Sequence, residues 1–202
     1  MNKKQASYLN LLYSKIIVFA TGSAGSGKSF IAGSYALKLL VENKIDNIIL
    51  TRALVEAGGE KLGSLPGEVV DKYAPYVEPY KDIFETHVGK GYTKYLISSE
   101  KIQGRPMAYM RSKTFNKSVV ILSEAQNATP EQVFLLLTRL GEGSLLIIEG
   151  DIKQKDIRGV SGLEDALQVI GGLDGVGSIH FDIEDCVRSE MVKAILKAYE
   201  EV

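Results

Sequence analysis

A glycine-rich segment near the start of the chain constrains the fold more than any other feature. Residues 22–29 read GSAGSGKS and complete the pattern G-x-x-x-x-G-K-S, between an apolar run at 16–21 and a helix-forming stretch at 28–42. Glycines let the backbone curl so that successive N–H groups point inward and bind anions at a helix N-terminus. The context predicts a strand, a phosphate-binding loop and a helix. The alternative, a glycine-rich turn with an incidental lysine, would arise by chance in on the order of 1% of such chains.

Each position of this loop is assigned to nucleotide binding. Lys28 supplies a positive charge for the β- and γ-phosphates, and the Ser29 hydroxyl is a ligand for Mg²⁺. ATP and Mg²⁺ are therefore the expected ligands. The strength of any preference for ATP over GTP stays open. The residues assigned here are Gly22, Ser23, Ala24, Gly25, Ser26, Gly27, Lys28 and Ser29.

Apolar runs alternate with amphipathic stretches along the chain. Continuous apolar runs of this length are typical of parallel strands that are buried on both faces. Helix-capping patterns begin at Thr129, Ser161 and Ser189, and they predict helices to about residues 140, 171 and 200. The alternation predicts an α/β fold of the P-loop NTPase class, with a mainly parallel core sheet of five strands flanked by helices. The predicted strands are residues 16–21, 47–51, 118–123, 144–149 and 178–182.

The segment between the second and third strands, about residues 53–117, is too long for a simple crossover. Glycines and prolines divide it, which predicts short helices and turns. We interpret it as a helical or irregular insertion at the functional edge of the sheet. Residues 1–202 are then expected to form a single domain.

Composition excludes several classes of protein. The net charge is −1, so there is no overall basic field, and the single cysteine, Cys186, cannot form an internal disulfide. No apolar run approaches the roughly 20 residues that span a bilayer, and the N-terminus lacks a signal-peptide pattern. Secreted, membrane-spanning and disulfide-framework proteins are excluded, and a cytoplasmic location is expected.

The third predicted strand ends in polar residues that can serve phosphate chemistry. Ser123 and Glu124 follow the apolar run at 119–122. At this position Glu124 can polarise the attacking water or bind Mg²⁺, and Ser123 can bind a metal-bound water. The alternative is that Glu124 is a solvent-exposed loop residue.

Several further segments carry a family resemblance. Together with residues 22–29 they cover nearly the whole chain from residue 16, and the chain resembles the PhoH-like family of phosphate-starvation-inducible ATP-binding proteins. The core of that family resembles the first motor domain of superfamily 1 helicases. The matching segments are residues 52–63, 65–67, 108–111, 124–127, 137–141, 150–151 with Gln154, 161–163 and 187–188.

The chain departs from the family pattern at four positions. The family normally has aspartate where Ser123 stands, threonine or serine where Glu149 stands, and proline where Ala53 and Ser23 stand. Ser123 adds no negative charge to a Mg²⁺ site, which puts metal affinity and turnover in question. One hypothesis is that Glu149, on the strand expected between the first and third, partly restores the lost carboxylate. The alternative is that Glu149 turns toward solvent.

The resemblance implies roles for three residues that lie outside the loop. Gln154 resembles a residue that contacts the γ-phosphate or the water, and the alternative is an ordinary turn. Arg188 resembles a late arginine that stabilises transition-state charge, and the alternative is a salt bridge near the last helix. Arg52 is expected to couple nucleotide state to bound nucleic acid.

The resemblance also points to the start of the chain. Asn2 and Gln5 resemble the upstream glutamine that reads adenine in helicase-like motors, because an amide can pair with both the adenine amino group and a ring nitrogen. The alternative for Gln5 is a solvated terminal residue.

Residues 87–117 combine cations with aromatic rings. This pattern suits RNA or single-stranded DNA, because cations follow phosphates and rings stack on bases. The alternative is a solvated basic surface over buried rings. The residues are Lys90, Lys94, Lys101, Arg105, Arg111, Lys113 and Lys117 with Tyr92, Tyr95, Tyr109 and Phe115.

One motor core cannot form both walls of a helicase nucleotide site. The resemblance implies a homo-oligomeric ring, plausible as a hexamer, with Arg188 or Arg139 near a subunit interface. The sequence favours a Mg²⁺-dependent ATPase with Lys28, Glu124, Gln154 and Arg188 as catalytic residues. A nucleotide-binding assembly or regulatory module with weak hydrolysis is the first alternative, and a small-molecule kinase the second.

Overall fold

A computed structural model describes residues 1–53 and 69–200 of the chain. Six strands form one parallel sheet in the order β3-β2-β4-β5-β1-β6. The fourth predicted strand, β5, does lie between the first and the third, as expected. The strand bounds are β1 Ile17–Gly22, β2 Asn47–Arg52, β3 Ile102–Gly104, β4 Ser118–Ser123, β5 Leu145–Gly150 and β6 Val176–Phe181.

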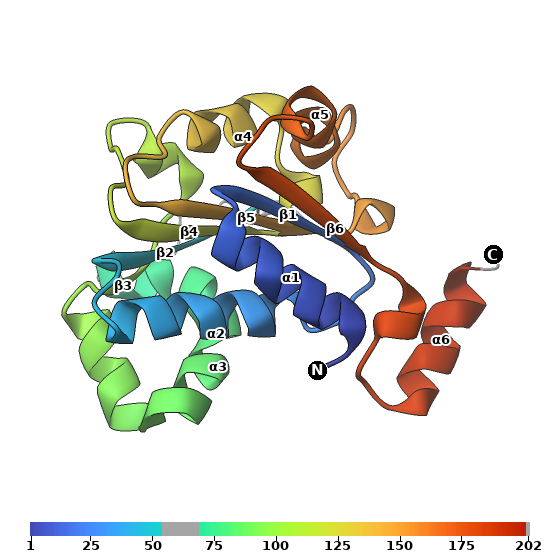
Figure 1. Cartoon of the computed structure of the whole chain (residues 1–202), viewed down its shortest axis with the longest axis horizontal. Helices are drawn as coiled ribbons and strands as arrows, with labels where there is room; N and C mark the ends of the chain where they lie inside the picture. The colour runs from blue at the N-terminus through green and yellow to red at the C-terminus, as the bar shows by residue number, and fades with distance from the viewer. Residues whose placement is uncertain (54–68, 201–202) are drawn as a thin grey trace.

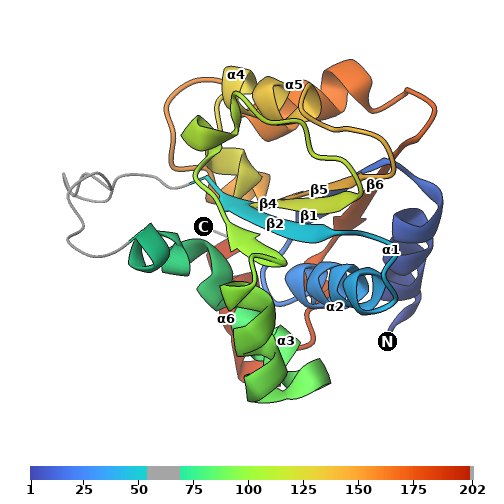
Figure 2. The same cartoon turned by 90° about the vertical axis from the view of Figure 1, so that its left-hand side faces the viewer.

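Helices cover both faces of the sheet. Alternate residues of each strand point to opposite faces, so Ile147 packs with the α1, α2 and α3 side whereas Ile148 packs with the α4 and α5 side. Figures 1 and 2 show these two layers, with α6 beyond the end of β6. The α/β prediction is confirmed. The helix bounds are α1 Lys3–Ser14, α2 Lys28–Val41, α3 Val69–Ser98, α4 Pro130–Leu137, α5 Gly162–Ile170 and α6 Glu190–Glu200.

The insertion differs from its prediction in two ways. It contributes a sixth strand, because Ile102, Gln103 and Gly104 pair with β2 at the sheet edge, and a run of three residues is too short to recognise from sequence. Pro75 and Pro79 do not divide it into short helices, since both lie within α3, and the break in the helical geometry of α3 is at Gly89 instead.

The chain also begins with a helix that the sequence analysis missed. The side chain of Asn2 accepts a hydrogen bond from the Gln5 backbone N–H, and the Gln5 side chain accepts one from the Asn2 backbone N–H. This reciprocal pair is a capping box and starts α1. The Asn-x-x-Gln spacing is the sequence signal that would have revealed it.

The family-like segments at 52–63 and 65–67 lie largely outside the described residues. Among the helices that are described, none is both long enough and apolar enough to pass through a bilayer.

Candidate functional site

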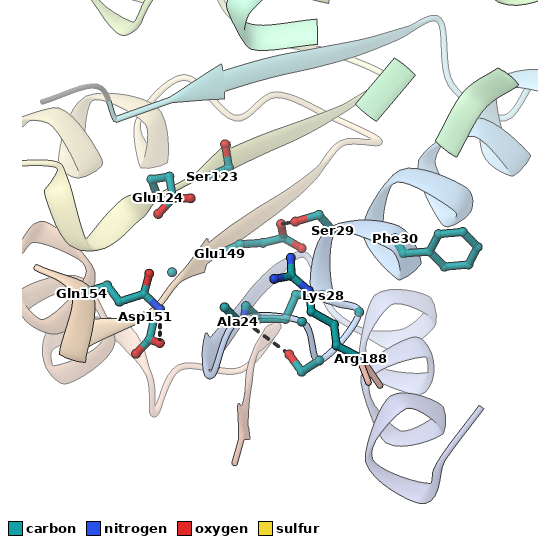
Figure 3. A pocket seen from close by; sticks show the side chains of 14 residues that line it. Ala24, Lys28, Ser29, Phe30, Ser123, Glu124, Glu149, Asp151, Gln154 and Arg188 are labelled. Carbon is teal, nitrogen blue, oxygen red and sulfur yellow. Dashed lines mark hydrogen bonds between the residues drawn. The ribbon is translucent and has the colours of Figure 1, made fainter. Parts of the chain in front are cut away.

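The carboxyl ends of β1, β4 and β5 border a cavity of about 310 Å³. The glycine-rich loop forms one wall, and the residues after β4 and β5 form the other (Figure 3). Carboxyl ends of parallel strands are where ligands bind in open α/β sheets. The cavity brings together most of the predicted site: Ala24, Gly25, Ser26, Gly27, Lys28, Ser29, Ser123, Glu124, Gln154 and Arg188, with Glu149 and Asp151.

The loop requires glycine at two of its turns. Gly22 has φ +102°, and a Cβ placed there would lie 1.9 Å from the carbonyl oxygen of Phe181. Gly25 has φ +75°, and a Cβ there would lie 2.9–3.0 Å from side-chain atoms of Arg188. Only glycine combines a left-handed backbone with such close approach. Gly22 and Ser23 shape the loop at its entry and do not line the cavity.

Lys28 begins α2 and folds back onto the loop. Its Nζ donates to the carbonyl oxygens of Gly22, at 2.6 Å, and Ser23, at 2.8 Å. Burial lowers the pKa of Lys28, while the negative charges of Glu149, Asp151 and Glu124 oppose that shift. A partly desolvated ammonium next to backbone N–H groups is a strong site for an anion.

The Ser29 hydroxyl donates to Oε2 of Glu149 at 2.7 Å (Figure 3). Glu149 is only 2% exposed, so the alternative in which it turns toward solvent is wrong. Burial raises the pKa of Glu149, and the hydrogen bond from Ser29 and the charge of Lys28 counteract that rise. This carboxylate therefore lies at the cavity wall beside the predicted metal ligand Ser29.

Two tyrosines that the sequence analysis did not single out hold this carboxylate. Tyr8 on α1 donates to Oε1 of Glu149, and Tyr80 on α3 donates to Oε2, both at 3.2 Å. Burial raises the pKa of each tyrosine well above its usual value, and the charge of Glu149 adds to the rise. Both hydroxyls therefore remain protonated and act as donors.

Glu124 follows Ser123 in a left-handed conformation, with φ 53°. Its Oε1 lies 3.4 Å from Nη2 of Arg52, and its Oε2 accepts a hydrogen bond from Gln126 at 2.8 Å. Left-handed backbone is costly for a residue with a side chain and often accompanies a functional position. Ser123 donates to the carbonyl oxygen of Thr51 at 3.4 Å and lines the same cavity.

A hydrogen-bond network links the residues that follow β4 to those that follow β5. The buried Gln126 accepts from the backbone N–H of Asp151 at 3.1 Å and donates to the carbonyl oxygen of Gln154 at 3.3 Å. The Gln154 side chain donates to Oδ2 of Asp151 at 2.9 Å. Gln126 therefore couples the position of Glu124 to that of Gln154.

Arg188 reaches the cavity from the segment before α6. The backbone N–H of Val187 donates to the carbonyl oxygen of Gly25 at 2.9 Å, which fixes Arg188 against the loop (Figure 3). Other residues form ion pairs at the last helix, with Lys197 and Glu184 2.7 Å apart and Lys193 and Glu190 2.9 Å apart. Arg139 does not line this cavity, and its Nη1 donates to the carbonyl oxygen of Arg111.

Gln5 lies against the back of the loop. Its Nε2 donates to the carbonyl oxygen of Ser26 at 3.0 Å, and only 7% of Gln5 is exposed. The alternative of a solvated terminal glutamine is therefore wrong. Adenine recognition by Gln5 stays a prediction, with one further donor hydrogen left on its amide nitrogen.

The basic and aromatic region at 87–117 divides between two faces. Tyr92 and Tyr95 on α3 are 46% and 58% exposed and stack on each other, with ring centroids 5.8 Å apart. Tyr109, 65% exposed, lies in the 3-10 helix Met107–Met110, which packs with the α4 and α5 layer. Phe115 is only 6% exposed and belongs to the core, so its predicted role as a stacking ring is wrong.

The comparisons with known proteins agree with this geometry. The family described as "PhoH-like protein" matches residues 1–200. The chain belongs to this family. It is 44% identical over 202 residues to "Protein PhoH" of Escherichia coli strain K12, and 42% identical over 198 residues to a "PhoH-like protein" of Bacillus subtilis strain 168. These matches cover 98% and 97% of this PhoH-like chain, but 57% and 62% of the relatives, so the chain spans about three-fifths of their length.

A solved structure shares the fold of this PhoH-like chain. The large terminase from a thermophilic bacteriophage superposes with a TM-score of 0.57 at 12% sequence identity, and the match covers 96% of this chain and 49% of the terminase. At this level of identity the likeness concerns the fold alone.

Proposed function

We propose that this PhoH-like chain binds ATP with Mg²⁺ as one P-loop NTPase domain, residues 1–202, and hydrolyses it. One observation carries the proposal: residues from four separate segments converge on a single cavity at the carboxyl edge of the sheet. These residues are Lys28, Ser29, Glu124, Gln154 and Arg188.

The loop and Lys28 supply the phosphate-binding part of the mechanism. Backbone N–H groups at the start of α2 and the Lys28 ammonium face the cavity, where they offset the charge of the β- and γ-phosphates. The donor set fits Mg²⁺, because the Ser29 hydroxyl and carboxylate oxygens lie together at the wall. Magnesium, when bound, neutralises charge that develops on the phosphate oxygens.

The opposite wall supplies the groups for hydrolysis. Glu124 accepts a proton from the attacking water, and Gln154 orients that water or the γ-phosphate. Arg188 lies over the loop and stabilises negative charge in the transition state. Gln126 holds Glu124 and Gln154 in a fixed relation.

Phosphate release from ATP tests this proposal directly. We expect Mg²⁺-dependent release by the unmodified chain and loss of nucleotide binding in Lys28→Ala. Calorimetry with Mg²⁺ and ATP separates binding from turnover. The absence of both heat and phosphate release in the unmodified chain would contradict the proposal.

A nucleotide-binding regulatory module is a second candidate, and two observations favour it. Ser123 brings no charge to the site, and both oxygens of Glu124 are already engaged by Arg52 and Gln126. This candidate predicts tight Mg²⁺–ATP binding with little phosphate release, even when single-stranded RNA is added.

We also propose that RNA or single-stranded DNA binds to residues 87–117 and that the chain forms a homo-oligomeric ring. The exposed pair of Tyr92 and Tyr95 supports the first part, because these rings alternate along α3 with the cations Lys90 and Lys94. Binding of labelled single-stranded RNA should weaken as salt rises and in Tyr92→Ala/Tyr95→Ala. Sedimentation in the presence of Mg²⁺–ATP tests the ring.

A further inference from the structure

We propose that Glu149 is the carboxylate of the Mg²⁺ site in this chain, in place of the aspartate that the family has where Ser123 stands. The inference rests on the proposed binding of Mg²⁺ and nucleotide and names the residue that carries the charge. The metal-site carboxylate then lies at the end of β5, whereas the family pattern has it at the end of β4.

The sheet register makes this exchange possible. Leu122 of β4 pairs with Ile148 of β5 in parallel, so Ser123 and Glu149 follow at adjacent positions at the carboxyl edge. Both line the cavity. β5 is the neighbour of β1, which leads into the loop, and a carboxylate on β5 therefore lies beside Ser29.

The surroundings of Glu149 fit a cation. The carboxylate accepts hydrogen bonds from three neutral hydroxyls, those of Ser29, Tyr8 and Tyr80. Lys28, the cation whose charge acts on it, directs its own hydrogen bonds to two backbone carbonyls and to the Ser26 hydroxyl. A buried carboxylate is unfavourable without a compensating charge, which a metal ion at the Ser29 hydroxyl would provide.

The two tyrosines are positioning residues for this carboxylate. Tyr8 and Tyr80 bond to different oxygens, so together they fix the plane of the carboxylate. The side chains of Ser29 and Ser123 also lie near the Tyr80 hydroxyl, where they partly oppose the rise in its pKa. An aspartate at 123 would place a second negative charge at this junction, where like charges repel, and serine avoids that repulsion.

Manganese binding provides a readout that does not depend on turnover. Mn²⁺ affinity is measured by electron paramagnetic resonance with ADP present, and ADP affinity is measured separately in EDTA by fluorescence of a labelled ADP. We expect Glu149→Gln to weaken Mn²⁺ binding by about tenfold or more, because a metal-site carboxylate is lost. Its metal-free ADP affinity should not fall. The matched control is Glu42→Gln, an exposed glutamate at the far end of α2, which should bind Mn²⁺ like the unmodified chain.

A charge-return variant separates a metal role from a structural one. Glu149→Thr should lose Mn²⁺ affinity, and Ser123→Asp combined with Glu149→Thr should regain it, because the carboxylate returns to β4. Equal Mn²⁺ affinity in Glu149→Gln and the unmodified chain would overturn the proposal, as would failure of the double variant to bind Mn²⁺ better than Glu149→Thr while both still bind ADP in EDTA. Failure of the unmodified chain to bind ADP at all would instead reject the proposed function itself.

Discussion

Arg52 and Glu124 stand across the ends of neighbouring strands, with Nη2 of the arginine 3.4 Å from Oε1 of the carboxylate. β2 and β4 pair at Arg52 and Ser123, which places the arginine beside the loop that carries Glu124. Both side chains are more than a third exposed, so the pair adds little to stability. The pair instead orients the Glu124 carboxylate, because Arg52 donates to one of its oxygens and Gln126 donates to the other.

The first prediction concerns Glu124 as the proposed base. Glu124→Gln keeps the shape of the side chain and removes its ability to accept a proton. We expect ATP turnover to fall by about 10²–10⁴-fold, the usual contribution of general-base catalysis. Affinity for Mg²⁺–ATP should stay unchanged, because the loop and Lys28 bind the phosphates. Single-turnover phosphate release and calorimetry measure the two quantities.

A matched variant is Arg158→Ala, which removes an exposed arginine outside the cavity. It should leave turnover as it is. If Glu124→Gln hydrolyses ATP at the rate of the unmodified chain, another group must activate the water.

The second prediction concerns the entry of the glycine-rich loop. Gly22→Ala places a Cβ against the carbonyl oxygen of Phe181 at a backbone φ of +102°. We expect the free energy of unfolding to fall by at least about 2 kcal/mol, because strain and a backbone clash act together. Urea denaturation provides the measurement.

Gly91→Ala is the control for this change. Gly91 lies within α3, and a Cβ there meets nothing within 4 Å. Alanine at an open helical position stabilises by about 0.5–1 kcal/mol relative to glycine. Equal stabilities of the two variants would show that the loop tolerates a side chain at position 22.

The strongest sequence signals came from features that depend only on residues close together in the chain. The loop motif and the long β-branched runs each specify their own structure, and the positions of the five longer strands and the α/β class followed from them. β3 could not be foreseen, because its three residues become a strand only by pairing with the exposed edge of β2. Pro75 and Pro79 favoured turns locally, yet α3 continues through them while it packs against α2 and β3.

The contacts of Glu149 depend on distances that the sequence does not contain. The hypothesis that Glu149 replaces a lost carboxylate used the order of the strands, but its orientation depends on Tyr8 and Tyr80, which come from two helices far apart in the chain. α1 was missed although its capping box is visible in the sequence. Tyr80 gave no signal, because it is one of three tyrosines within residues 73–80 and no pattern distinguishes it from the other two.

The third prediction concerns Gln5 and the choice of base. Gln5→Ala removes the hydrogen bond to Ser26 and half of the capping box, and we expect a loss of about 1 kcal/mol in stability. If the free amide hydrogen of Gln5 reads adenine, ATP affinity should fall more than GTP affinity. Calorimetric titration with both nucleotides measures the ratio.

Asn2→Ala is the comparison, because it removes the cap and keeps the glutamine amide, and it also tests Asn2 as the other candidate for reading adenine. It should lower stability without changing the ratio of ATP to GTP affinity. A ratio that is the same in the unmodified chain and in Gln5→Ala would show that Gln5 supports the loop without reading the base.

The last prediction concerns the pH dependence of the contact that ties α1 to the segment after β6. The Nζ atom of Lys4 donates to Oδ2 of Asp182 at 2.6 Å and lies 2.9 Å from Oδ2 of Asp185. The hydrogen bond from Lys4 lowers the pKa of Asp182 below its ordinary value of 3.8, and the hydrogen bonds to both aspartates raise the pKa of Lys4 above 10.5. The stabilisation is therefore present between pH 3.8 and pH 10.5. It is lost as pH falls through the lowered pKa of Asp182, and it is lost again as pH rises through the raised pKa of Lys4.

Lys4→Met should be less stable than the unmodified chain at neutral pH, and the difference should shrink in acid and in high salt. Lys3→Met, at the exposed neighbouring position, should show no such difference. Urea denaturation of the three chains across this pH range makes the comparison, and a gap that persists in strong acid would show that Lys4 stabilises through the packing of its alkyl stem.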